Sequence, residues 1–261
     1  MRAATPFLLI LVLALPSSAQ QAPTCDLAAL GARFRDGAVG SSWREQGLHT
    51  AWLGERVDSQ QSWTRVVTRE SEERWGVRYL AFKDKGSEGP AAPASGAFVR
   101  GPKRWTWTPA SKAPVDRDLE QAAKQEARRR SRQAGLADWL VRLLPKAPVK
   151  VGQTWKLELA EAARLLEVPY PEAPAPKTSS AQGKLVALSP SHATVEVAVK
   201  LDYPGDAETD PAEAGLKLRA SLPRRGVSGS LEITAWIKTP DESVRELRRV
   251  ERSALAQAKQ E

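Results

Sequence analysis

The chain has 261 residues, of which 41% are hydrophobic and 27% charged, and its formal net charge is +8. These values are ordinary for a globular protein that forms one large domain or two small ones. The single cysteine, Cys25, excludes an intrachain disulfide and leaves either an incidental thiol or an intermolecular disulfide. The basic residues are interleaved with acidic ones, a pattern typical of solvated surfaces. Attraction to anionic lipid headgroups or polysaccharide stays open on charge alone.

Residues 1–19 are expected to form a cleaved secretory signal peptide. Arg2 supplies a positive charge, Phe7 to Leu15 form an unbroken apolar run, and small residues precede the end of the segment at Ala19. This run is too short to cross a bilayer, which takes about 20 residues in a helix. We therefore expect an exported protein, periplasmic or extracellular, with no transmembrane segment after cleavage and no nucleic-acid partner. Residues 20–46 are expected to be a flexible amino-terminal segment.

Residues 47–114 are predicted to be rich in β-structure. The segments "SWTRVVTRE" and "RWGVRYLAFK" carry β-branched and aromatic residues, and the polar "SEE" between them favours a turn. In the second segment, alternation places Trp75, Tyr79 and Ala81 on one face and Phe82 on the other. A Gly/Pro/Ala loop over 86–96 precedes "AFVRGPKRWTWTP", which predicts a hairpin with two tryptophans on one face of a strand.

Residues 115–145 are predicted to be helical. The first half has only a thin apolar stripe, and Gly135 marks a break. The second half follows the helical template at Leu136, Trp139, Leu140, Leu143 and Leu144. The helix ends at Pro145, because proline excludes the α conformation from the residue before it.

Residues 146–255 are predicted to be β-rich, with a tail over 256–261. Trp155 lies in a short strand after a turn at Gly152, a short helix is expected near 159–167, and 169–183 is a Pro-rich loop or linker. "HATVEVAVKLD" alternates apolar and polar residues and pairs with "GKLVALS"; "SGSLEITAWIK" alternates likewise and returns as a hairpin into "SVRELRRVERS". The fold class is therefore α+β, mainly antiparallel sheet (curved sheet, half-barrel or sandwich) with a central helical segment.

Residues that could support catalysis or bind a metal are scarce in the sequence. The two histidines are His49 and His192, and the latter lies in a turn without the partners of a catalytic serine. The acidic segment "GDAETDPAEAG" has alternate acids, but Pro211 stands where a calcium loop needs glycine. We expect no metal, no cofactor and no catalytic residues, although spacing alone does not exclude a pair of carboxylates.

The segment Leu143 to Trp155 contains Leu-Leu-Pro, Pro-Val-Lys-Val-Gly and Gln-Thr-Trp. It resembles a pattern, P-V-K-V-G-[DQ]-[ST]-W, in uncharacterised exported proteins of GC-rich bacteria, where a short helix and long antiparallel strands follow. The resemblance covers about the last 120 residues. It implies export and this β-rich arrangement and transfers no activity, so the segment is interpreted as a fold signature.

Nine tryptophans are unusual beside four phenylalanines and three tyrosines. They either fill wide β-surfaces or line an apolar ligand groove. The second interpretation predicts ligand contacts at Trp105, Trp107, Trp155 and Trp236. The preferred hypothesis is a non-enzymatic envelope protein that binds an apolar or amphipathic ligand, such as a lipid, or an envelope protein partner. A carboxylate-dependent envelope hydrolase and a purely structural interaction module remain as alternatives.

Overall fold

The computed structural model of the chain describes residues 23–87, 91–112, 114–132, 136–158, 178–205 and 210–255. Several predictions concern residues outside these ranges: the signal peptide over 1–19, the helix break at Gly135, the helix near 159–167, the acids Asp206 and Glu208, and the tail over 256–261. Among the described helices, none has the length and apolar character needed to cross a bilayer.

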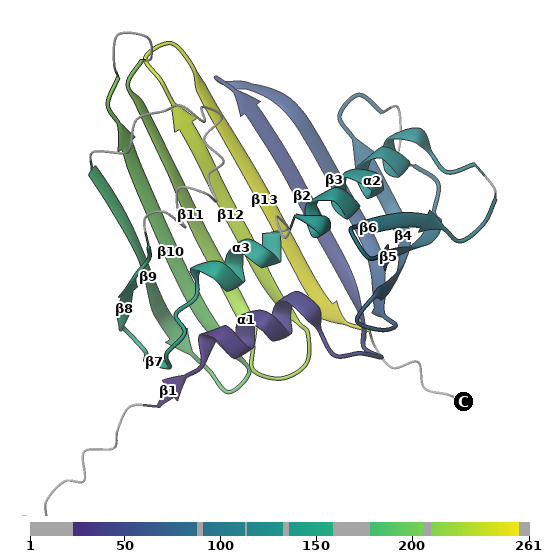
Figure 1. Ribbon diagram of the computed structural model, residues 1–261, viewed down its shortest axis with the longest axis horizontal. Helices are drawn as coiled ribbons and strands as arrows, with labels where there is room; N and C mark the ends of the chain where they lie inside the picture. Colours follow the sequence, from purple (N-terminus) through teal and green to yellow (C-terminus); the bar gives the residue numbers. More distant parts are fainter. Residues whose placement is uncertain are drawn as a thin grey trace, which may run out of the picture.

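One antiparallel sheet of eleven strands dominates the fold and confirms the predicted α+β class. Its strands are β2 (Ser42–Leu53), β3 (Arg56–Arg69), β4 (Arg74–Asp84), β5 (Ala94–Arg100), β6 (Trp105–Pro109), β8 (Thr154–Lys156), β9 (Thr178–Leu188), β10 (His192–Tyr203), β11 (Ala212–Pro223), β12 (Gly229–Lys238) and β13 (Ser243–Ala254). Their order across the sheet is β6-β5-β4-β3-β2-β13-β12-β11-β10-β9-β8 (Figure 1). The first and last long strands, β2 and β13, therefore pair at its centre and join the two β-rich parts of the chain.

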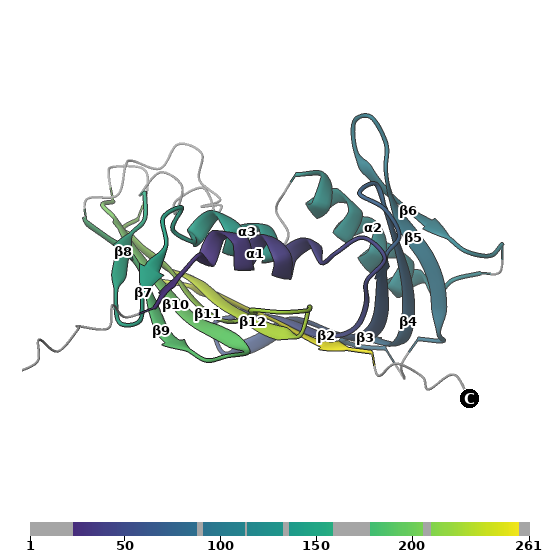
Figure 2. The same cartoon turned by 90° about the horizontal axis from the view of Figure 1, so that it is seen from below.

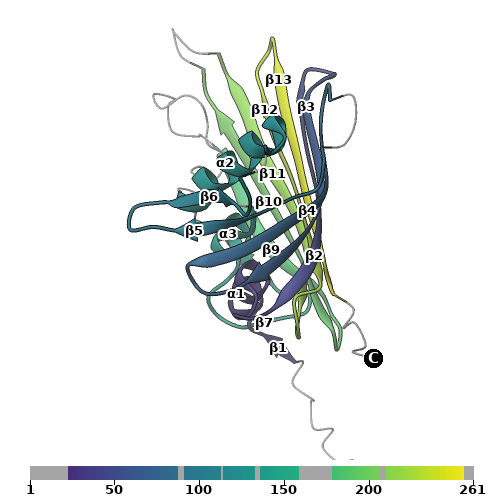
Figure 3. The same cartoon turned by 90° about the vertical axis from the view of Figure 1, so that its right-hand side faces the viewer.

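The sheet is curved and open, and three helices lie along its concave side (Figure 2). These are α1 (Leu27–Asp36), α2 (Arg117–Ser131) and α3 (Leu136–Leu143), so the predicted central helical segment consists of α2 and α3. α1 and α3 pack together over β11 and β12, whereas α2 packs against β4 and β6. Strands β4 to β6 curl up beside α2 (Figure 3). Among the predicted architectures, the structure is the curved sheet.

Residues 24–36 form a strand and a helix in place of part of the flexible segment predicted over 20–46. Strand β1 (Thr24–Cys25) pairs with β7 (Val149–Lys150), and Asp26 caps α1 by accepting a hydrogen bond from the backbone N–H of Ala29 at 3.0 Å. Leu27, Leu30 and Phe34 of α1 are buried in the core. The thiol of Cys25 is also buried, and burial raises its pKa. The buried apolar residues of α1 lie on one face of the helix, and this face packs in the core.

The carboxyl-terminal half of the sheet confirms the predicted alternation. Val195, Val197, Val199 and Leu201 of β10 are buried, and the intervening side chains are more exposed. The predicted hairpins form between β9 and β10 and between β12 and β13, so the last segment is a strand and not a helix. Strand β9 begins at Thr178, which shortens the Pro-rich loop predicted over 169–183. α3 covers this apolar face, as its helical spacing predicts.

A β-bulge in β4 overturns one facial assignment. Arg65 of β3 pairs with Tyr79, but the preceding Thr64 pairs with Ala81, so one residue of β4 is left without a partner in the register. This extra residue returns Phe82 to the face of Tyr79, where it is buried, and leaves Ala81 half-buried. Strict alternation predicts that Ala81 lies on the face of Tyr79. The bulge shifts the alternation by one residue, so Phe82 lies there instead.

The segment between α3 and β9 joins helix and sheet through Trp155. Gly152 adopts φ 83° in the predicted turn, and its N–H donates to the carbonyl of Leu185 at 2.8 Å. The indole Nε1 of Trp155 donates to the carbonyl of Leu143 at 3.0 Å, and so satisfies a terminal carbonyl of α3. The Leu143–Trp155 segment therefore connects the end of α3 to the edge of the sheet.

Candidate ligand-binding cavity

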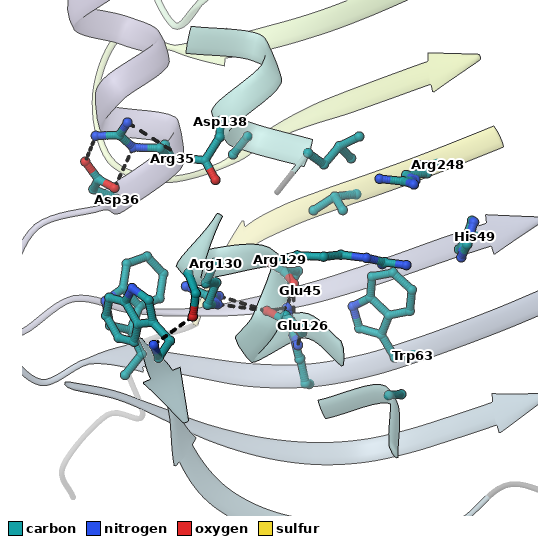
Figure 4. A pocket seen from close by; sticks show the side chains of 18 of the residues that line it. Arg35, Asp36, Glu45, His49, Trp63, Glu126, Arg129, Arg130, Asp138 and Arg248 are labelled. Carbon is teal, nitrogen blue, oxygen red and sulfur yellow. Dashed lines mark hydrogen bonds and ion pairs between the residues drawn. The ribbon is translucent and has the colours of Figure 1, made fainter. Parts of the chain in front are cut away.

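A cavity of about 410 Å³ lies on the concave side of the sheet, where α2 diverges from α1 and α3 (Figure 4). Strands β2, β3, β4 and β13 form its floor, the start of α3 and the end of α1 form one wall, and α2 forms the other. The turn between β5 and β6 lies at its mouth. Ligand sites in proteins commonly occupy about 300 to 1,000 Å³, so this volume suits a small molecule.

Aromatic side chains provide the apolar lining of the cavity. Trp63, Trp75 and Phe82 come from the floor, and Trp105 comes from β6. Apolar residues of the helices add to them, including Ala122 on α2. Tryptophan combines a large apolar ring with one N–H donor, and the buried Nε1 of Trp63 has no hydrogen-bond partner among the described residues. This lining can hold an apolar group next to a polar one.

A buried ion network lies at the base of the cavity. Its members, here called the arginine–glutamate cluster, are Glu45, Arg65, Glu126, Arg130 and Arg252. Arg65 donates to both oxygens of Glu126 at 2.5 and 3.1 Å, and to Glu45 Oε1 at 2.9 and 2.5 Å. It also donates to the Tyr79 hydroxyl at 2.9 Å. Arg65 is therefore saturated with acceptors.

Arg130 and Arg252 complete the cluster from opposite sides. Arg252 Nε donates to Glu45 Oε2 at 3.0 Å from β13. Arg130 donates through Nε and Nη2 to Glu126 Oε1 at 3.1 and 2.9 Å from α2. Arg130 also stacks on the Trp75 ring, with its guanidinium carbon 4.5 Å from the ring centre. The cluster thus links α2 to the central strands β2, β3 and β13.

The electrostatics of the cluster follow from burial and its unequal charges. Burial raises the pKa of Glu45, but the charges of Arg65 and Arg252 outweigh it and hold that pKa well below its usual range. Burial also raises the pKa of Glu126, but Arg65 and Arg130 lower it overall. Burial lowers the pKa of Arg252, and repulsion from Arg130 and Arg65 acts in the same direction. Both carboxylates are therefore ionised at neutral pH.

Two further ion pairs lie along the cavity. Arg35 binds Asp36 at 2.7 Å where α1 ends. Beside the floor, Glu246 of β13 pairs with His49 and with Arg248, the latter at 2.7 Å, and both of these partners line the cavity. Burial raises the pKa of Glu246, but the hydrogen bond with His49 and the charge of Arg248 outweigh it and lower that pKa to about 2. The cavity therefore has charged groups at its base and along one side, and aromatic groups between them (Figure 4).

The structure places the four predicted contact tryptophans in four different parts of the molecule. Trp105 lines the cavity. Trp107 is buried and does not line the cavity, and its ring lies 5.1 Å from that of Phe98 and 6.0 Å from that of Tyr79. Trp155 packs against the carboxyl-terminal core. Trp236 lies between two residues that face this core, so its side chain is on the opposite, convex face.

Three of these four tryptophans share a packing role that the sequence analysis did not recognise. A Cβ on Gly96 would lie 2.4 Å from the ring of Trp107, and a Cβ on Gly183 would lie 2.2 Å from the ring of Trp155. Each ring therefore lies on the backbone of a glycine in a neighbouring strand, a contact that only glycine permits. Two further pairs have the same geometry, Trp236 with Gly215 and Trp63 with Gly47.

The sequence analysis also did not identify the arginine–glutamate cluster. Alternation gives a signal for it, because Glu45 and Arg65 stand at inward positions, between Trp43 and Gly47 and between Trp63 and Val67. Charged residues at inward positions of a strand indicate a buried ion pair. The pairing of β2 with β13, which brings Arg252 to the cluster, follows from the topology and not from any local pattern.

The described residues offer little to metal or acid–base chemistry. Across them, no group of three or more His, Cys, Asp and Glu side chains converges on one point. His192 is the first residue of β10 and not part of the predicted turn, and its Nε2 lies 3.1 Å from the Ser228 carbonyl. A glycosidase-type pair needs one carboxyl with a raised pKa as its acid, whereas the pKa values of Glu45 and Glu126 are both lowered. This pair therefore lends no support to the hydrolase alternative.

Comparisons with known proteins give no functional assignment. No protein-family model and no curated protein matches the chain. The chain is similar to a solved structure described as "Lipid-protein interactions in lipovitellin", with a TM-score of 0.37 and 8% sequence identity. The match covers 85% of this chain and 26% of that one, so the chain spans about a quarter of its length. A similarity of this size carries no argument about function.

Proposed function

We propose that the chain is a non-enzymatic binding protein of the bacterial envelope that holds an amphipathic ligand on the concave face of its sheet. The observation that carries this proposal is the cavity of about 410 Å³ between α2 and the α1–α3 pair. Aromatic side chains line it beside a buried cluster of charges. Such a lining suits a ligand with an apolar part and a polar part.

Export to the envelope is part of the same proposal. It rests on the charged, apolar and small-residue regions of residues 1–19, and on the resemblance of Leu143–Trp155 to exported proteins. Cleavage after Ala19 removes the apolar run and leaves a mature chain of residues 20–261. The location determines which amphiphiles the protein meets, so it is tested together with the ligand.

The direct test is non-denaturing mass spectrometry of the mature chain purified from its native envelope fraction. We expect a chain that starts at residue 20 and carries an added mass of amphiphile size, released when the protein is denatured. A protein partner in place of the small molecule would favour the partner-binding alternative. A bare chain that also takes up no added amphiphile would overturn the proposal.

A cavity-filling variant links any bound ligand to this cavity. Ala122 lines the cavity from α2, so Ala122→Phe places a ring inside it and should abolish uptake of the amphiphile. The matched control is Gln121→Phe, an exposed position one residue earlier on the same helix, which should leave uptake unchanged. Circular dichroism and thermal unfolding of both variants show whether the fold is kept. Equal uptake by Ala122→Phe and the native chain would place the ligand elsewhere.

A further inference from the structure

The arginine–glutamate cluster holds more positive charge than its carboxylates neutralise. Three guanidinium groups, those of Arg65, Arg130 and Arg252, share the carboxylates of Glu45 and Glu126. The side chains of Arg65, Arg252 and Glu45 are only 6%, 7% and 4% exposed, so water screens this excess poorly. A buried charge is costly unless it is paired, so a cluster of this composition is suited to one more anion.

The other acidic groups along the cavity are engaged elsewhere. Asp36 and Asp138 lie 2.7 and 3.8 Å from Arg35, whose side chain is 37% exposed at the cavity edge. Glu246, beside the floor, pairs with Arg248. Among the described residues none of these acids pairs with Arg65, Arg130 or Arg252, so they do not neutralise the excess at the base of the cavity.

Basic residues also surround the mouth of the cavity. Arg100 ends β5, Lys103 and Arg104 lie on the exposed turn that follows, and Arg129 lines the cavity from α2. Basic groups at a mouth raise the local concentration of anions and speed their entry. The charge at the mouth thus has the same sign as the excess at the base.

We propose that the arginine–glutamate cluster binds the anionic headgroup of the ligand while the aromatic lining holds its apolar chain. This inference rests on the proposed function and names the ligand class, a single-chain amphiphile with a carboxylate or phosphate headgroup. Arg252 Nη1 donates to the Phe34 carbonyl, so the donors left for such a headgroup are Nη1 of Arg130 and Nη2 of Arg252, for which the described residues provide no acceptor. The aromatic rings of Trp63 and Trp105 line the same cavity, where they contact the apolar chain of the ligand.

The test compares amphiphiles with the same chain and different headgroups. The mature protein is titrated with dodecanoate, dodecyl phosphate, dodecanol and dodecyltrimethylammonium below their micelle concentrations, with binding measured by non-denaturing mass spectrometry. We expect the two anions to bind about tenfold or more tightly than dodecanol, since a charge-assisted hydrogen bond contributes at least that factor. The cation should bind least. The tighter of the two anions identifies the headgroup as carboxylate or phosphate.

Two variants change the charge of the cluster in opposite directions. Arg130→Gln removes the excess charge and should reduce the ratio of dodecanoate to dodecanol affinity about tenfold. Glu126→Gln increases the excess and should raise this ratio. A general loss of structure lowers both affinities and does not move the ratio in opposite directions. Arg219→Gln, at an exposed arginine on the convex face, removes the same charge and should leave the ratio unchanged.

The outcomes separate this inference from the proposed function. Equal binding of dodecanoate and dodecanol would overturn the headgroup inference and leave an amphiphile-binding protein. No binding of any dodecyl compound would overturn both. Inorganic phosphate that binds as tightly as dodecyl phosphate would overturn the amphiphilic ligand and support an anion site alone. If Arg130→Gln does not fold, the Glu126→Gln variant and the four native-chain affinities still decide the question.

Discussion

Strands β9 to β12 and strands β2 to β4 both turn one face toward a helix, yet they bury different side chains. The first group buries aliphatic residues such as Val197, Leu216 and Leu218 against α1 and α3. The second buries aromatic rings, together with the charged pair Glu45 and Arg65, against α2. The cavity lies over the second group and extends to the boundary with the first.

This difference separates the part of the protein that stabilises the fold from the part that suits a ligand. Burial of aliphatic side chains stabilises a fold without specific partners. Buried ion pairs are weak evidence for stability, because desolvation of the charges offsets much of their attraction. The proposed anion site accounts for the unequal number of charges in this buried network, which folding alone does not require. Four variants test this comparison, in order of decreasing expected effect.

The largest effect is expected for Arg65→Met, at the centre of the charged region. The change leaves Glu45 and Glu126 buried beside fewer cations and should lower the free energy of unfolding by about 3 to 5 kcal/mol. Urea unfolding followed by tryptophan fluorescence measures this change. The control, Arg219→Met on the exposed convex face, should cost about 1 kcal/mol or less. Equal losses in the two variants would show that the buried network does not differ energetically from a surface pair.

A slightly smaller loss is expected for Leu140→Ala, in the aliphatic half. Leu140 is fully buried between α3 and the sheet, and its truncation should cost about 3 kcal/mol through lost burial and the void left behind. It does not line the cavity, so amphiphile affinity of the folded protein should stay the same. Urea unfolding and ligand titration of the same sample separate the two quantities. A changed affinity would mean that the two halves are coupled.

An intermediate, pH-dependent effect is expected from Glu246, which pairs with His49 and Arg248 beside the cavity. Its folded-state pKa of about 2 lies below the unfolded value of 4.5, so its contribution is fully present above about pH 4.5 and is lost as pH falls toward 2. Glu246→Gln should therefore reduce the stability lost between pH 6 and pH 3 by about 2 kcal/mol. Urea unfolding at both pH values measures the difference. If the variant and the native chain lose the same stability between pH 6 and pH 3, the pKa of Glu246 is not lowered in the folded state.

Local patterns in the sequence predicted the strands and helices well but not how distant strands meet. The alternation of β10 and the helical spacing of α3 each state which face is buried, and the structure confirms both. The bulge that returns Phe82 to the inner face has no residue signature that alternation can detect. The cluster of Glu45, Glu126 and Arg252 needs the pairing of β2 with β13 and the placement of α2, which no single segment encodes.

The tryptophans of the candidate site also show that local sequence patterns do not predict how neighbouring strands are aligned. The sequence indicated that they suit β-surfaces or a groove, and both interpretations apply, but to different residues. Trp105 and Trp63 line the cavity, and Trp63 also covers Gly47, whereas Trp107 and Trp155 fill the core over glycines. The glycine partner lies on a neighbouring strand, so strand register decides which tryptophan covers a glycine. Register was not available from the sequence, and this explains why only one of the four predicted contacts lines the cavity.

The smallest effect is expected for Trp236→Ala, on the convex face away from both halves of the core. The ring covers Gly215 across the β11–β12 pair and is partly open to solvent, so its loss should cost about 1 kcal/mol or less, the usual size of a cross-strand contact. Amphiphile affinity should be unchanged, whereas Trp105→Ala should weaken it at a similar cost in stability. Urea unfolding and dodecanoate titration of the two variants measure both effects. A loss of affinity in Trp236→Ala would mean that the convex face contributes to ligand binding, contrary to the assignment of that role to the concave side.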